Sequence, residues 1–260
     1  TSVMNCIFIG NRVGREGAAV SNWRTFADFT NCSFYGNDAQ ENGGAMENYL
    51  ATVELNRCTF NGNMADEYGG AIHAYGSDPN YINCVFSGNS GATGGAIHDD
   101  IDDGIKVVNS TFTANYASEN GGAYYRLASR GKFINCILWD DAPQEVYSLT
   151  GTPEILYSDV QGYTSTEQGN IDADPRFRDA LGPDGIAGTL DDDLRLLVGS
   201  PCIDAGSDTP LLEFVTTDLA GQARTVNAQV DMGAYEFDGP YNYYVNAITG
   251  DDTFAGYSPN

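Results

Sequence analysis

Apolar and polar residues alternate in short runs along the first part of the chain. The clearest run surrounds Cys84, where Ile82, Cys84 and Phe86 alternate with Asn83, Val85 and Ser87. A period of two predicts a short β-strand with one apolar face. The run Gly94-Gly95-Ala96-Ile97 follows and predicts a second short strand, whose small residues let a neighbouring chain approach closely. Helical periodicity is absent, so the pattern predicts an all-β fold.

These runs recur at a constant spacing. Steps of 26 residues separate the members of two columns, which are Cys6, Cys32, Cys58, Cys84, Ser110 and Cys136, and Asn11, Asn37, Asn63, Asn89, Asn115 and Asp141. Two or three short strands in such a period predict the coils of a right-handed parallel β-helix, stacked about 4.8 Å apart. We expect about six coils over residues 1–140. The Cys column then fills the interior, and the Asn column bonds amide to amide along the stack, so both form structural ladders.

The paired motifs of each coil resemble a known repeat. Gly-Gly-Ala plus an apolar residue alternates with Phe-x-x-Asn, at Phe34 to Asn37, Phe60 to Asn63, Phe86 to Asn89 and Phe112 to Asn115. The pair is similar to the repeat of polymorphic outer-membrane proteins and related bacterial β-helix surface proteins, over about residues 1–140. The resemblance implies a secreted or surface-displayed protein that acts in adhesion.

After residue 140 the repeat becomes irregular. Four motifs follow in order, which are Ser-Asp-Val-Gln-Gly at 158–162, Gly-Asn-Ile-Asp-Ala-Asp-Pro at 169–175, Gly-Ser-Pro-Cys-Ile-Asp-Ala-Gly at 199–206 and Asp-Met-Gly-Ala-Tyr-Glu at 231–236. Together they resemble the choice-of-anchor Q domain, which closes many bacterial β-helix proteins. The resemblance implies that residues 141–237 form an irregular C-terminal β cap that continues the β-helix.

The segment 238–260 resembles the first strand of a following β-helix. Tyr243, Tyr244 and Val245 precede a Gly-Asp-Asp turn, whereas residues 1–6 read as the middle of a coil. We hypothesise that this C-terminal strand completes the first coil of the next copy, either within a tandem protein or between chains of a fibre. The alternative is that the boundaries of the sequence carry no such meaning.

The charge of the chain limits its partners. Only 12 Lys and Arg residues stand against 36 Asp and Glu residues, giving a formal net charge of −24. This balance excludes nucleic acid as a partner, because little basic charge is present to neutralise phosphates. It favours an extracellular or cell-surface location, with cations or cationic molecules as partners. No stretch has the length of a transmembrane helix.

The six cysteines raise the question of disulfides. Five share one ladder column, where stacked side chains point the same way and meet in a poor geometry for a disulfide bond. We expect buried free thiols there, and Cys202 is expected to be a core residue as well.

Acidic residues offer three candidate metal sites. The best is a Gly-rich loop in the cap with five carboxylates, namely Asp179, Asp184, Asp191, Asp192 and Asp193, which predicts a Ca²⁺ site. A second is the acidic turn Asp99–Asp103. The third is a stacked column of Glu47, His73 and His98, which is either a metal or acid–base cluster or a row of tolerated solvent-facing residues.

The sequence gives little support for a catalytic function. The repeats show no pair of aspartates stacked on one strand face, and no nucleophile motif is visible. We therefore expect a structural or adhesive protein without catalytic residues. The alternative is a polysaccharide-binding or polysaccharide-degrading, pectate-lyase-like β-helix, since the 16 tyrosines could stack on sugar rings.

Overall fold

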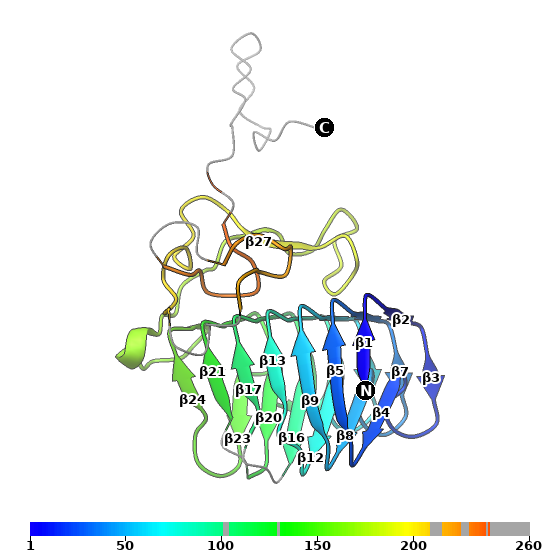
Figure 1. Ribbon diagram of the computed structural model, residues 1–260. Coiled ribbons are helices and arrows are strands. Elements are labelled where there is room, and N and C mark those ends of the chain that lie inside the picture. The colour runs from blue at the N-terminus through cyan, green and yellow to red at the C-terminus, as the bar shows by residue number, and fades with distance from the viewer. Residues whose placement is uncertain (101–103, 129–130, 209–214, 225–228, 238, 240–260) are drawn as a thin grey trace.

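The computed structural model describes residues 1–100, 104–128, 131–208, 215–224, 229–237 and 239. Its main body is a solenoid of stacked parallel strands with about six turns, as Figure 1 shows. The strand partners lie about 26 residues apart, for example Thr59 with Val85 and with Ser33. No α-helix occurs among the described residues. The predicted all-β parallel β-helix is therefore confirmed.

Two seven-stranded parallel sheets form one half of the solenoid wall. Sheet A contains β1 (Ser2–Met4), β5 (Phe26–Thr30), β9 (Thr52–Asn56), β13 (Asn80–Ile82), β17 (Lys106–Val108), β21 (Lys132–Ile134) and β24 (Glu154–Leu156). Sheet B contains β2 (Ile7–Ile9), β6 (Ser33–Tyr35), β10 (Thr59–Asn61), β14 (Val85–Ser87), β18 (Thr111–Thr113), β22 (Ile137–Trp139) and β25 (Asp159–Val160). Parallel stacking thus extends past residue 140, to Val160.

Two further parallel sheets complete each coil. Sheet C contains β3 (Arg12–Val13), β7 (Asp38–Ala39), β11 (Met64–Ala65), β15 (Ser90–Thr93) and β19 (Tyr116–Asn120). Sheet D contains β4 (Val20–Trp23), β8 (Met46–Tyr49), β12 (Ile72–Tyr75), β16 (Ile97–Asp100), β20 (Tyr124–Arg126) and β23 (Val146–Ser148). We number the coils by their strands, so that coil 1 is β1–β4, coil 2 is β5–β8, coil 3 is β9–β12 and coil 4 is β13–β16.

The corners of the coils follow from local sequence. The residue before each member of the Cys column has a positive φ, for example 55° at Asn31 and 53° at Asn83, and Asn tolerates this left-handed conformation well. The Gly-Gly pairs form another corner, since a Cβ on Gly44 would lie 2.1 Å from the carbonyl oxygen of Gly70. The strand therefore begins after Gly-Gly-Ala, at Met46 in coil 2, and not on the glycines as the pattern suggested.

The interior is filled by columns of identical residues. Phenylalanine rings stack along sheet B with centroids 4.5–4.9 Å apart, in the order Phe8, Phe34, Phe60, Phe86 and Phe112. One apolar cluster runs through the stack from Ala27 to Val160. Burial of these columns supplies the main stabilisation of the solenoid.

The chain after Val160 packs against the outside of the solenoid (Figure 1). It contains a short 3₁₀ helix, η1 (Glu167–Gly169), and one antiparallel pair, β26 (Phe177–Asp179) with β27 (Asp193–Leu196). Leu194 and Ala234 pack around Val85 on the outer face of sheet B. The described part of this segment also lies against Gly62 and Gly88 in coils 3 and 4, whereas Ile7 of coil 1 is 72% exposed.

Candidate histidine and carboxylate site

The strongest cluster of chemically competent side chains lies on the outer face of sheet D. In each strand of this sheet the residue after the buried apolar one points outward, which stacks Glu47, His73, His98 and Tyr125 in neighbouring coils. Asp100 lies two residues after His98 and points to the same side, because side chains alternate along a strand. The sheet register therefore brings together residues of coils 2, 3 and 4.

The polar contacts form a continuous chain. His73 contacts a carboxylate with each ring nitrogen, since Nδ1 lies 2.8 Å from Glu47 Oε2 and Nε2 lies 3.3 Å from Asp100 Oδ2. His98 Nε2 lies 3.1 Å from the other Asp100 oxygen, Oδ1. His98 Nδ1 contacts Thr93, at 2.7 Å from the hydroxyl and 3.3 Å from the carbonyl oxygen. Asp100 thus lies between the two imidazoles.

Neighbouring aromatic rings shield this cluster from water. The ring of Tyr68 lies 4.5 Å from that of His98 and 5.7 Å from that of His73, and Tyr125 stacks on His98 at 4.5 Å. Glu47, His73 and His98 are only 3%, 5% and 4% exposed. The interpretation of this column as a row of solvent-facing residues is therefore wrong, because side chains from the adjacent turns cover it.

The electrostatics of the cluster favour a protonated His73 beside an ionised Asp100. Burial by itself would lower the pKa of His73, but its hydrogen bonds to Asp100 and Glu47 outweigh burial and raise the pKa to about 9. Burial by itself would raise the pKa of Asp100, but its contacts with His73 and His98 hold that pKa well below the usual range. At neutral pH, His73 is therefore a buried imidazolium between carboxylates.

Sequence reasoning named Glu47, His73 and His98 but missed Asp100 and Thr93 as partners of the histidines. The spacing between the Asn column and the histidines did indicate that coils 3 and 4 differ at this turn. Ten residues separate Asn63 from His73, whereas nine separate Asn89 from His98. Coil 4 is therefore one residue shorter at this turn, so that Thr93 pairs with Tyr68 of the coil before it.

The first two residues of the acidic turn Asp99–Asp103 have different partners in the structure. Asp99 is buried and accepts a hydrogen bond from the hydroxyl of Tyr124, whereas Asp100 joins the histidines. Residues 101–103 lie outside the described residues.

The predicted calcium loop satisfies its carboxylates largely from within. Asp192 accepts hydrogen bonds from the backbone N–H groups of Gly188 and Thr189, and Asp184 accepts one from Ile186. Asp193 forms ion pairs with Arg178 and Arg195. Of the described His, Cys, Asp and Glu residues, only His73, His98 and Asp100 bring three potential ligand atoms within 4.8 Å of one another. The calcium site, which includes Asp179 and Asp191, stays a prediction.

The Asn column forms a continuous ladder in the wall. Each side-chain Nδ2 donates to the Oδ1 of the next member, over 2.7–2.9 Å, from Asn11 through Asn37, Asn63, Asn89 and Asn115 to Asp141. Each Oδ1 also accepts from the backbone N–H of the member before it, as in Asn37 N to Asn63 Oδ1 at 3.0 Å. We call this row the amide ladder.

The Cys column stacks beside the amide ladder. Cys6, Cys32, Cys58, Cys84 and Cys136 are all free thiols, as is Cys202. Burial raises the pKa of Cys84 and Cys136 to about 12, so these thiols stay protonated and unreactive at neutral pH.

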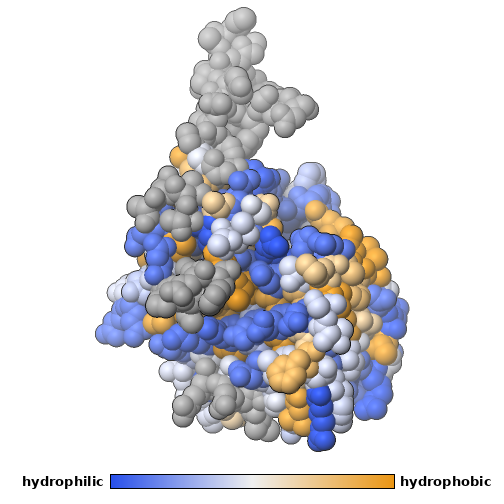
Figure 2. Space-filling view, in the orientation of Figure 1, coloured by the Kyte–Doolittle hydropathy of each residue, from blue (hydrophilic) through white to orange (hydrophobic). Residues whose placement is uncertain are grey.

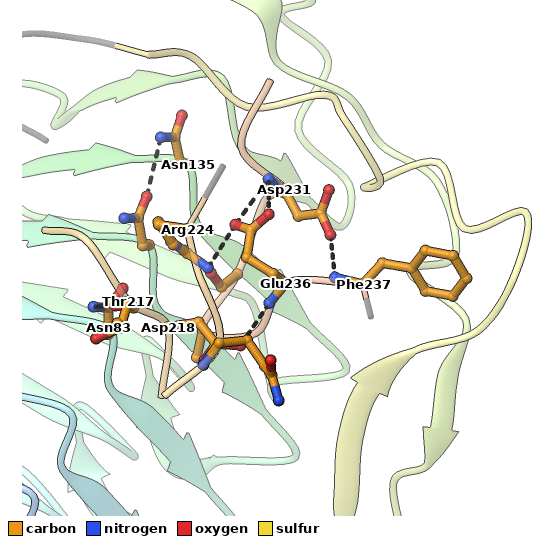
Figure 3. A network of polar contacts seen from close by, with 12 residues as sticks. Asn83, Asn135, Thr217, Asp218, Arg224, Asp231, Glu236 and Phe237 are labelled. Carbon is orange, nitrogen blue, oxygen red and sulfur yellow. Dashed lines mark hydrogen bonds and ion pairs between the residues drawn. The ribbon is translucent and has the colours of Figure 1, made fainter. Parts of the chain in front are cut away.

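The last two cap motifs meet in a buried polar network, drawn in Figure 3. Arg224 forms an ion pair with Glu236 at 2.9 Å, and Asp231 accepts hydrogen bonds from the backbone N–H groups of Asp204 and Phe237. The backbone N–H of Met232 donates to the Cys202 carbonyl at 3.0 Å, which joins segments 199–206 and 231–236. Arg224, Asp231 and Glu236 each pair with another residue of the cap, so we interpret this network as one that holds the cap together.

Comparisons with known proteins give one short match. The family described as the Chlamydia polymorphic membrane protein repeat matches residues 57–75, which run through coil 3 from Arg57 to Tyr75. No curated protein and no solved structure matches the chain. Together with the parallel solenoid, the repeat supports a surface-exposed β-helix protein and suggests the bacterial outer surface. The choice-of-anchor Q interpretation stays a prediction.

A membrane-spanning helix was not expected from the sequence. Within the described ranges, no helix is long and apolar enough to cross a bilayer. The proposed joining strand, Tyr243 to Val245, lies outside the described residues.

Proposed function

We propose that this protein is an extracellular structural or adhesive β-helix whose coil 1 is covered by the C-terminal strand of another copy. The parallel solenoid and its matched repeat are the observation that carries the structural role, and coil 1 is the place that we propose for the contact between copies. All four of its strands, β1 to β4, are outermost in their sheets, and outermost strands present unpaired backbone groups.

Coil 1 also exposes apolar side chains. Ile7 is 72% exposed and Ile9 is 57% exposed, and Met4, Trp23 and Phe26 are exposed nearby. Figure 2 shows apolar side chains gathered at the end of the solenoid that carries coil 1. A contiguous apolar patch beside unpaired strands is typical of a surface that pairs with another strand. A contact of this kind joins two different surfaces and therefore generates a filament or a tandem array.

Electron microscopy of the purified protein, together with sedimentation velocity, tests this assembly. We expect filaments, and we expect their loss in the double variant Ile7→Lys/Ile9→Lys and in Val245→Asp. Met64→Lys is the matched control, because Met64 is an exposed apolar residue in the middle of the stack. A calcium chelator added to the unmodified protein tests whether the acidic loop contributes.

Each outcome has a distinct meaning. Short rods at every concentration of the unmodified protein would overturn head-to-tail assembly. Filaments that persist in the Ile7→Lys/Ile9→Lys variant would place the contact elsewhere.

The polysaccharide alternative has weaker support. Trp23, Tyr49 and Tyr75 form an aromatic column on the outer face of sheet D, with ring centroids 4.1 and 5.1 Å apart. Because these rings stack face to face, each covers the face of its neighbour that a sugar ring would need. The column therefore favours a structural role over a glycan platform.

A further inference from the structure

The two histidines on sheet D lie in a site with a surplus of hydrogen-bond acceptors. His73 has a carboxylate oxygen beside each ring nitrogen, at 2.8 Å from Glu47 and 3.3 Å from Asp100. A neutral imidazole has one N–H, so it can donate to only one of these two carboxylates. The contact between Nε2 and Asp100 therefore needs a further positive species, which is either a proton or a metal ion.

Protons balance the charge of this site only if both histidines are imidazolium ions. Glu47 and Asp100 contribute two negative charges, and a doubly protonated His73 contributes one positive charge. His98 can stay neutral, with the Thr93 hydroxyl donating to Nδ1 and Nε2–H donating to Asp100. With His98 neutral the sum is one negative charge in a cluster where Glu47, His73 and His98 are almost fully buried and Asp100 is partly buried, and buried charge is costly unless it is balanced.

We propose that His73 Nε2, His98 Nε2 and the Asp100 carboxylate bind a divalent transition-metal ion of the Zn²⁺ class, which links coil 3 to coil 4. The ion replaces the proton on each Nε2 atom. Its two positive charges balance Glu47 and Asp100, and both imidazoles become neutral ligands. Imidazole nitrogen with one carboxylate is a ligand set that suits zinc and its neighbours better than calcium or magnesium.

The distances agree with this assignment. Ligand atoms that share a tetrahedral Zn²⁺ ion at about 2.0–2.1 Å lie roughly 3.3–3.4 Å apart. The contacts of Asp100 with His73 and His98 are 3.3 and 3.1 Å, and the three ligand atoms all lie within 4.8 Å of one another. The two contacts use different oxygens of Asp100, so binding requires one oxygen to turn toward both rings and the rings to move closer together.

The partners of the remaining ring nitrogens complete the arrangement. Metal-binding histidines commonly donate their other N–H to a carboxylate or carbonyl, which fixes the tautomer. Glu47 is placed to accept from His73 Nδ1, and the Thr93 carbonyl and hydroxyl are placed to accept from His98 Nδ1. Both Nε2 lone pairs are thereby directed toward Asp100, and Glu47 and Thr93 act as positioning residues.

Zinc titration of the untagged 260-residue chain tests the site, with excess Mg²⁺ present to occupy weak carboxylate sites. We expect one Zn²⁺ per chain, with an affinity that falls about 100-fold or more in His98→Gln and in Asp100→Asn. Glu47→Gln, which removes no ligand, is expected to weaken binding by about 10- to 100-fold. Asp184→Asn is the matched control, because it removes an exposed carboxylate of the acidic loop, and it should bind zinc as the unmodified protein does.

X-ray absorption of the zinc-loaded, unmodified protein gives a readout that does not depend on how the variants fold. We expect nitrogen and oxygen ligands at about 2.0–2.1 Å, with an imidazole signature. Sulfur ligands at about 2.3 Å would overturn the proposal in favour of the cysteines. So would the absence of stoichiometric binding, or zinc affinity that is unchanged in His98→Gln and Asp100→Asn.

Discussion

The amide ladder and the histidine cluster are both columns of residues stacked from coil to coil, but they differ in their balance of hydrogen-bond donors and acceptors. In the amide ladder the same residue recurs, so each interior Asn donates to the next member and accepts from the one before it. In the histidine cluster each coil supplies a different residue, Glu47, then His73, then His98. Acceptors outnumber donors there, and a cation completes the cluster.

The difference shows that different columns of a solenoid can serve for stability and for binding. A column of one self-complementary residue satisfies itself for any number of coils. A column whose residue changes from coil to coil does not pair with itself in this way, and it can place charged side chains next to one another. Departures from the repeat are therefore the places to look for binding in this fold.

The largest effect is expected where the amide ladder is broken in its interior. Asn63→Ala removes donations to Asn89 Oδ1 and the Phe34 carbonyl, and leaves the Asn37 N–H groups without their acceptor. Because these groups are buried, we expect a loss of about 3 kcal/mol in the free energy of unfolding, measured by urea denaturation.

The matched control for this variant is Asn11→Ala at the end of the ladder. Asn11 is exposed, so water replaces its bonds to Asn37, and we expect a loss below about 1 kcal/mol. Equal losses in the two variants would contradict the cooperative ladder.

A smaller effect is expected at Asp141, where the ladder ends on an acid. Burial raises the pKa of Asp141 to about 7, and it also raises the pKa of Glu145 beside it. Since the folded state favours the protonated acid, this contribution is fully present below pH about 4 and is lost as the pH rises through about 7. The unmodified protein should therefore lose stability between pH 5 and pH 8.

Asp141→Asn restores the repeated residue and removes this titration. We expect the variant to be more stable than the unmodified protein by roughly 2 kcal/mol at pH 8, and about equal to it at about pH 4. Asp28→Asn is the control, because Asp28 is exposed and lies in β5 of coil 2, and it should leave the pH profile unchanged. A parallel fall in stability for Asp141→Asn and the unmodified protein would show that another group titrates.

The smallest effect is expected from Ser110→Cys, which returns the one exception in the Cys column to the repeat. Ser110 Oγ accepts from the Cys84 N–H and donates to the Val108 carbonyl, both at 3.0 Å. The variant weakens these bonds but buries a more apolar side chain, so we expect a change within about 1 kcal/mol in urea denaturation. A loss of several kcal/mol would mean that the hydroxyl holds this coil in place.

The columns could be predicted because a strand has a short, regular period. The 26-residue step predicted the stacking of Asn37 on Asn63. The single strand predicted around Cys84 is wrong, because Asn83 has a positive φ and turns the chain between β13 and β14. The histidine column was visible in the same way, but its burial was not. Tyr68, which covers His73 and His98, lies in a turn whose path the repeat does not specify.

The sequence by itself determined the parallel coils, the apolar interior and the two ladders, because each depends on residues at a fixed spacing along the chain. Only the tertiary structure decided that Asp100 contacts both His73 and His98 and that Tyr68 covers the two rings, because these contacts depend on side-chain directions and on the path of a neighbouring turn. It also decided that the cap packs on the outer face of sheet B, around Val85. Such contacts join residues with no common period, and their positions follow only from the packing of the whole chain.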